Sequence, residues 1–152
     1  GRMLRKVESM DMPFPLRLEE LFFPVQEVRA NPEHDPQGER TGTNLKHSFN
    51  TQPVEGQPGL YGVEMLIECD RETSSNPPYF FQLQVYALFR AEGNIDPTAM
   101  QGLIVSTGFS VLVGAARERL LDLTSRAPWG RFTMGIFQLI PQSIAEANEP
   151  AN

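Results

Sequence analysis

Cysteine is almost absent from this chain of 152 residues, in which Cys69 is the only one. A single cysteine excludes an internal disulfide and any metal site built from several thiolates. Histidine is nearly as rare, and the spacing of His34 and His47 does not match that of a zinc site. We therefore expect no metal, and no other cofactor is indicated.

Basic residues are also in the minority: 19 aspartates and glutamates outnumber 13 lysines and arginines, and the formal net charge is -6 at pH 7. A nucleic-acid binder needs a basic face, and none is evident. The sequence has no glycine-rich phosphate loop, no paired carboxylates, and no serine or cysteine nucleophile with a base nearby. We expect neither a nucleic-acid partner nor an enzyme.

The first residues lack the continuous apolar stretch of a signal peptide, so a cytoplasmic location is the default expectation. The length predicts a single domain over residues 1–152. The polar segments 1–12 and 142–152 are expected to be flexible tails.

The chain is organised around an uncharged stretch, residues 97–116, at the centre of a predicted helix over 95–126. Asp96 suits the N-cap, Pro97 suits the first helical position, and Pro128 follows the predicted end. The stretch is long enough to span a bilayer, but its glycines and polar residues favour burial in protein. We expect no membrane insertion.

Two sides of this helix are predicted to be buried. The first is an apolar stripe that should pack on the protein's own sheet: Phe109, Leu112, Val113, Ala116, Leu120 and Leu123, extended upstream by Gly102, Leu103 and Ser106. The second is a ridge of small residues that another helix can approach closely: Gly102, Ser106, Ser110 and Gly114, with Val111 and Ala115 beside them. A chain of this length is too short to cover both sides itself, so we expect a homo-oligomer.

Alternating apolar and polar residues predict four strands before the helix, over residues 16–29, 45–49, 63–69 and 81–90. The first should change register near Glu20 and be interrupted at Pro24. Residues 31–43 and 51–59 read as connections. The predicted fold class is α+β: a four-stranded antiparallel sheet, as a meander or Greek key, packed against one long C-terminal helix.

The helix carries the run Val111-Leu112-Val113-Gly114-Ala115-Ala116-Arg117-Glu118 and closes with Thr124-Ser125-Arg126. With a Gly-Asn-Ile-Asp-Pro turn before it and four strands upstream, this stretch resembles SecB-type export chaperones. The resemblance implies a four-stranded antiparallel sheet backed by the helix, assembling into dimers and then a dimer of dimers with the long helices between the sheets.

The same resemblance implies an ATP-independent holdase that binds unfolded polypeptides. In the export branch of the family such a protein hands its clients to the SecA motor, and relatives of the fold are dedicated chaperones of antitoxins in toxin–antitoxin–chaperone systems. The positions that match the family's client groove are Trp129, Phe132, Met134, Ile136, Phe137 and Leu139, any of which can instead complete the core. Glu64 and Glu68 resemble the acidic surface that contacts SecA, although a solvated strand face explains them equally.

Two other interpretations stay open. In a barrel or hotdog-like α+β fold, a curled sheet would surround the long helix and bind an apolar small molecule. Such folds usually place the helix between early strands, whereas here it follows nearly all of them. The third interpretation is a non-catalytic oligomeric adaptor that binds no clients.

Overall fold

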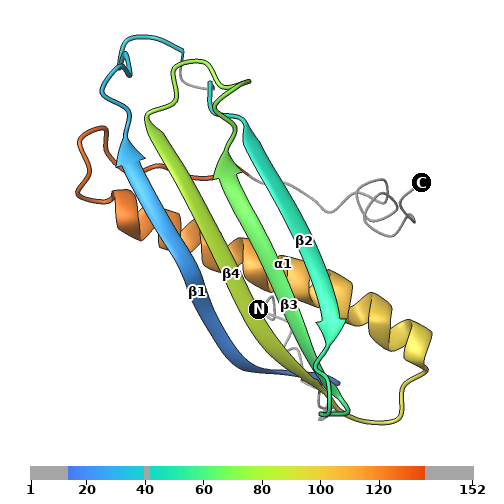
Figure 1. Ribbon diagram of the computed structural model, residues 1–152. Helices are drawn as coiled ribbons and strands as arrows, with labels where there is room; N and C mark the ends of the chain where they lie inside the picture. Colours follow the sequence, from blue (N-terminus) through green and yellow to red (C-terminus); the bar gives the residue numbers. More distant parts are fainter. Residues whose placement is uncertain (1–13, 40–41, 136–152) are drawn as a thin grey trace, which may run out of the picture.

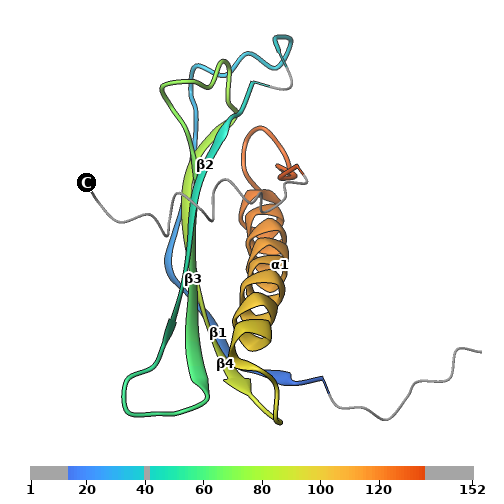
Figure 2. The same cartoon turned by 90° about the vertical axis from the view of Figure 1, so that its right-hand side faces the viewer.

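The computed structural model describes residues 14–39 and 42–135 and confirms the α+β class. Its strands are β1 (Leu16–Ala30), β2 (Leu45–Pro53), β3 (Leu60–Cys69) and β4 (Tyr79–Ala91), followed by the helix α1 (Pro97–Thr124). The four strands form one antiparallel sheet, and α1 lies on one face of it, as Figures 1 and 2 show. The described part of the molecule is thus a sheet layer with a single helix layer.

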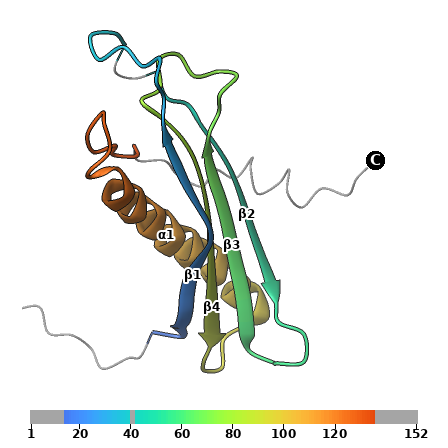
Figure 3. The same ribbon diagram turned by 60° about the vertical axis from the view of Figure 1, so that its left-hand side comes forward.

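The strand order is β1-β4-β3-β2 (Figure 3). β2, β3 and β4 are thus neighbours in the order of the chain, while β1, which precedes them in sequence, lies beside β4. This is the Greek-key order rather than the meander. β1 and β2 are the two edges and do not pair with each other, so the sheet stays open. A closed barrel is therefore excluded for the described sheet, and α1 lies on one face of it.

β1 has the irregular pairing that its sequence predicts. Its register with β4 shifts between Leu18 and Glu20 and again between Phe22 and Val25. The second shift contains Pro24, which an edge strand tolerates because a proline there costs no ladder hydrogen bond. The edge strand β2 runs to Pro53, beyond the predicted end at Phe49, because the alternation continues through Thr51.

The apolar residues of β3 and β4 face the helix, as their alternation predicts. The core residues of these two strands are Val63, Met65, Ile67 and Cys69, and Tyr79, Phe81, Leu83, Val85, Ala87 and Phe89. Burial raises the pKa of the Cys69 thiol above its ordinary value, which disfavours the reactive thiolate. Cys69 is therefore a core residue.

α1 begins where predicted, because the Asp96 carboxylate accepts hydrogen bonds from the backbone N–H groups of Thr98 and Ala99 at 3.1 and 3.2 Å. It ends at Thr124, two residues before the predicted end. Its buried residues are Met100, Ile104, Gly108, Phe109, Leu112, Val113, Ala116, Leu120 and Thr124.

The downstream part of the predicted stripe is thus confirmed, with Leu123 half-buried. Its upstream extension is wrong, because Gly102 and Ser106 are exposed and Leu103 is only half-buried. The residues four and eight positions before Leu112, namely Gly108 and Ile104, face the sheet instead. This is the spacing that 3.6 residues per turn requires.

Gly108 is the point of closest approach between helix and sheet. A Cβ atom built on it would lie 2.9 Å from Cγ1 of the fully buried Val63 on β3. From there α1 runs obliquely across the sheet, from the β2 side at its start to the β1 side at its end (Figure 1). The oblique crossing leaves part of β1 without helix over it.

Candidate functional site

The segment after α1 is held on the sheet by two buried hydroxyl groups. The Tyr79 hydroxyl donates to the Gly130 carbonyl at 2.6 Å and accepts from the Trp129 backbone N–H at 3.0 Å. The Thr124 hydroxyl donates to the Leu120 carbonyl at 2.7 Å and accepts from the Phe132 backbone N–H at 2.9 Å. The three bonds that reach Trp129, Gly130 and Phe132 turn the chain back after the helix.

Three of the predicted client-contacting residues lie on this returning segment. Phe132 is half-buried, with its ring centroid 5.4 Å from that of Phe81. Met134 is 1% exposed, so in the single chain it is a core residue rather than part of an open groove. The other three, Ile136, Phe137 and Leu139, lie outside the described residues.

Trp129 is tied to the loop that follows β1. Its indole N–H donates to the Asn31 carbonyl at 2.9 Å, and its ring centroid lies 5.0 Å from that of His34. The Asn31 side chain in turn donates to the Pro77 carbonyl, at 2.8 Å. Trp129 therefore joins the end of the helix to both loops at this end of the sheet.

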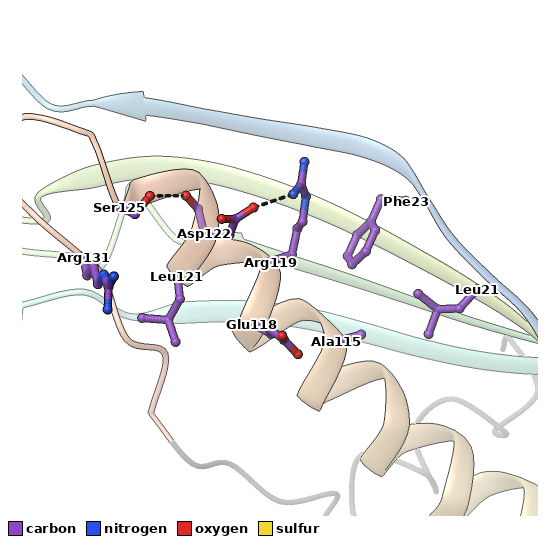
Figure 4. A pocket seen from close by; sticks show the side chains of 9 residues that line it. All are labelled: Leu21, Phe23, Ala115, Glu118, Arg119, Leu121, Asp122, Ser125 and Arg131. Carbon is purple, nitrogen blue, oxygen red and sulfur yellow. Dashed lines mark hydrogen bonds and ion pairs between the residues drawn. The ribbon is translucent and has the colours of Figure 1, made fainter.

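An open cleft of about 700 Å³ lies between β1 and the second half of α1 (Figure 4). Leu21 and Phe23 form its wall on β1, and Ala115 lies on its helix side. Arg119 crosses between the two elements, donating to the Gln26 side chain and pairing with Asp122 at 2.8 Å.

The apolar surface of β1 extends beyond this cleft. Leu18 faces the same side of the sheet, since it pairs with buried Phe89, yet it is 46% exposed. Together Leu18, Leu21 and Phe23, the β1 wall, form an apolar strip beside the helix. A strip of this kind on an edge strand is unusual unless something covers it.

Four further residues line the outer side of the same cleft: Glu118, Leu121, Ser125 and Arg131, which we call the outer rim. In Figure 4 Glu118, Leu121 and Arg131 are turned away from β1, and Leu121 is drawn between Glu118 and Arg131. Leu121 is half-buried and the other three are exposed. The rim is thus one apolar residue flanked by one acidic and one basic side chain.

The predicted small-residue ridge lies on the side of α1 away from the sheet. Gly102, Ser106 and Ser110 are exposed, while Gly114, Val111 and Ala115 are half-buried. Beyond the neighbouring backbone of the helix itself, no atom of the described residues lies within 4 Å of a Cβ built on Gly102 or Gly114, so the described part of the chain leaves this side open.

By length and composition α1 is also apolar enough to cross a bilayer, with a mean hydropathy of 1.5, although a core helix can meet the same criterion. Only 39% of that apolar window is buried within the chain. The outward side of α1 is therefore a second large uncovered surface.

Glu64 and Glu68 lie on the face of the sheet that carries no helix, as their positions between buried residues of β3 require. Glu68 forms an ion pair with Lys46 at 3.7 Å. Glu64 lies beside Tyr86, whose ring centroid is 5.2 Å from that of Phe22. The predicted acidic positions thus border a partly exposed aromatic pair.

The comparisons with known proteins find similarity only at the level of structure. No family model matches the sequence, and no curated protein matches it. A solved structure of the Mycobacterium tuberculosis SecB-like chaperone Rv1957, in complex with a ChAD peptide from the antitoxin HigA1 (Rv1956), matches with a TM-score of 0.57 at 16% identity. That match covers 82% of this chain and 88% of the Rv1957 chain.

A protein of unknown function from Streptococcus agalactiae also matches, with a TM-score of 0.41 at 12% identity over 80% of this chain and 97% of that one. A similarity this weak carries no argument. The α+β arrangement of four antiparallel strands and one long helix is therefore similar to the fold of the SecB-like chaperone Rv1957.

Proposed function

We propose that this protein is a non-enzymatic chaperone that binds unfolded polypeptides without ATP. Two observations support the proposal. The fold is similar to that of a SecB-like chaperone whose structure contains a bound peptide. The β1 wall is an apolar strip beside an open cleft, exposed at Leu18 and half-buried at Leu21 and Phe23, and it is the observation that carries the proposal. A ligand that binds the unfolded state more tightly than the native state retards folding and aggregation by mass action.

The β1 wall offers what a chaperone of this kind needs. Leu18, Leu21 and Phe23 bury apolar side chains of a client, and the outer edge of β1 is unpaired in the described sheet, so its backbone groups are available to an extended segment. Backbone hydrogen bonds and apolar contacts depend little on client sequence. We infer that clients are extended, apolar segments; Trp129 and Phe132, at the end of the same helix, are the further contacts that the family resemblance implies.

Replacing Leu18 and Phe23 together with serine is expected to weaken client binding at least about tenfold, because two apolar contacts are lost. The anisotropy of a labelled, permanently unfolded protein measures the affinity, and light scattering measures the suppression of its aggregation. The control is Phe22→Ser, which removes an aromatic side chain about as exposed as Leu18 from the opposite face of the same strand. The proposal is wrong if the control weakens binding as much as the double variant does.

We also propose that the protein is a homo-oligomer, a dimer or a dimer of dimers, in which the small-residue ridge of α1 is covered by a second copy. Replacing Gly114 with leucine is expected to abolish this association, because the new side chain would fill the space that a second helix needs. The single chain should keep its fold, since nothing lies within 4 Å of that position. Light scattering of the wild-type protein and this variant at micromolar concentration gives the two masses; equal masses would contradict the expectation.

The biological setting within this function is a further proposal. The peptide in the Rv1957 structure comes from an antitoxin, which favours a dedicated antitoxin chaperone, whereas an export chaperone would need to contact SecA through Glu64 and Glu68. Binding of purified SecA, measured with wild-type protein and with Glu64→Lys, separates these settings. Binding that the substitution abolishes supports export, and no binding supports the antitoxin role.

A further inference from the structure

The outer rim of the cleft carries two charged side chains that form no ion pair within the described part of the chain. Glu118 and Arg131 are both exposed, and neither forms an ion pair or side-chain hydrogen bond with any other residue in the described ranges 14–39 and 42–135. Their neighbours Arg119 and Asp122, by contrast, are paired with each other. Among the described residues, the rim therefore presents one negative and one positive charge without an ion-pair partner.

These two charges flank an apolar residue. Leu121 is half-buried on the outer side of α1, one turn beyond Glu118, and Figure 4 draws it between the Glu118 and Arg131 side chains. Ser125 and Ala115, which also line the cleft, are small and permit close approach. The patch thus runs from an acidic group, across a leucine, to a basic group.

We infer that this rim is a two-fold contact with a second copy of the chain. In such a contact the same patch meets itself: where residue i of one copy touches residue j of the other, residue j of the first copy touches residue i of the second. An axis passing close to Leu121 places Glu118 opposite Arg131 of the partner subunit, and Arg131 opposite Glu118 of the partner subunit. One operation therefore pairs both charges and buries both copies of Leu121.

Charge complementarity selects this occupant over a client peptide. An unfolded client would need a cation and an anion at one fixed separation, which a sequence-tolerant binder cannot require of its clients. A second copy of this chain supplies that arrangement by construction. The inference rests on the proposed self-association, which it deepens by naming the residues in contact, and the two are tested separately below.

Charge reversal tests the pairing. Glu118→Arg and Arg131→Glu should each weaken self-association about tenfold, because each converts two attractive pairs of the symmetric dimer into two repulsive ones. The double variant, in which both charges are exchanged, should associate within about threefold of the wild-type protein. Sedimentation equilibrium at several concentrations gives the dissociation constants of the wild-type protein and of each variant. The matched control is Glu27→Arg, an exposed reversal on the face of the sheet away from α1, which should change nothing.

Several results would overturn the inference: a double variant as weak as the single ones, single variants that associate like the wild-type protein, or a wild-type protein that is monomeric at micromolar concentration. A second readout does not depend on charge reversal. Raising the salt concentration should weaken the wild-type dimer more than Glu118→Gln/Arg131→Gln. If Gly114→Leu dissociates the protein while the reversals do not, self-association holds and the rim contact fails; client binding is measured independently of both.

Discussion

Gly108→Leu is expected to destabilise the fold by about 3 kcal/mol or more, the largest stability effect among single substitutions that we predict. Even a Cβ atom at this position lies 2.9 Å from the Val63 side chain, which is fully buried and cannot move aside. Three further carbon atoms would push the helix away from β3 at the centre of the interface. Urea unfolding followed by circular dichroism measures the change.

The matched control is Gly114→Leu, the same substitution six residues further along α1, where the built Cβ atom meets nothing. Its single-chain stability should rise slightly, because leucine favours a helix more than glycine does, by roughly 0.5–1 kcal/mol. If both leucine variants lose the same stability, the close approach at Gly108 is not the cause. Gly108→Ala should fall between them, because the gain in helix propensity offsets part of the overpacking.

Tyr79→Phe is expected to cost about 1–3 kcal/mol, because the backbone N–H of Trp129 and the carbonyl of Gly130 both lose a partner beside a buried ring. Phenylalanine keeps the ring, so the loss of stability comes from the missing hydroxyl group and not from a cavity. Trp129 is the single tryptophan of the chain, and its fluorescence should shift as the returning segment loosens. An unchanged emission spectrum together with unchanged stability would contradict the expectation.

The same tyrosine predicts a loss of stability in alkali. Burial raises the pKa of the Tyr79 hydroxyl above its ordinary value, an effect only partly offset by the hydrogen bond from the Trp129 backbone. A group whose pKa is raised on folding stabilises the native state below the unfolded-state pKa and ceases to do so as the pH rises through the folded-state pKa. Above about pH 10 the wild-type protein should therefore lose stability faster than Tyr79→Phe does. The urea midpoints of the two proteins, compared between pH 8 and pH 11, test this.

The sheet and the helix were predictable because their signals are local and periodic. The alternation in 81–90 marks β4, and Asp96 followed by Pro97 marks the start of α1. The interruption of β1 at Pro24 was also predictable, because a proline cannot donate to the ladder, and the register of β1 with β4 shifts there. The prediction for the upstream end of the apolar helix stripe was wrong because small residues fit equally well on either of two helix faces.

The candidate site was less predictable because it depends on contacts between distant parts of the chain. The Tyr79 hydroxyl reaches a carbonyl 51 residues away, and no sequence pattern marks such a pair. The cleft exists because α1 crosses the sheet obliquely, so Leu21 and Phe23, which alternate like ordinary core residues, are left beside the helix rather than beneath it. Met134, expected to contact clients because its position matches the family's client groove, is instead buried in the core.

The place of β1 beside β4 has a consequence for synthesis. Of the four described strands, β1 leaves the ribosome first but can complete its ladder only after β4 has emerged, since Leu16 pairs with Ala91 and Ala30 with Tyr79. Until then β1 lacks its partner strand and presents leucine and phenylalanine to its surroundings or to other nascent chains. Pairing over such a long span is slow. During its synthesis, a protein with this strand order is therefore itself an unfolded polypeptide with exposed apolar residues, which is the kind of client that we propose it binds.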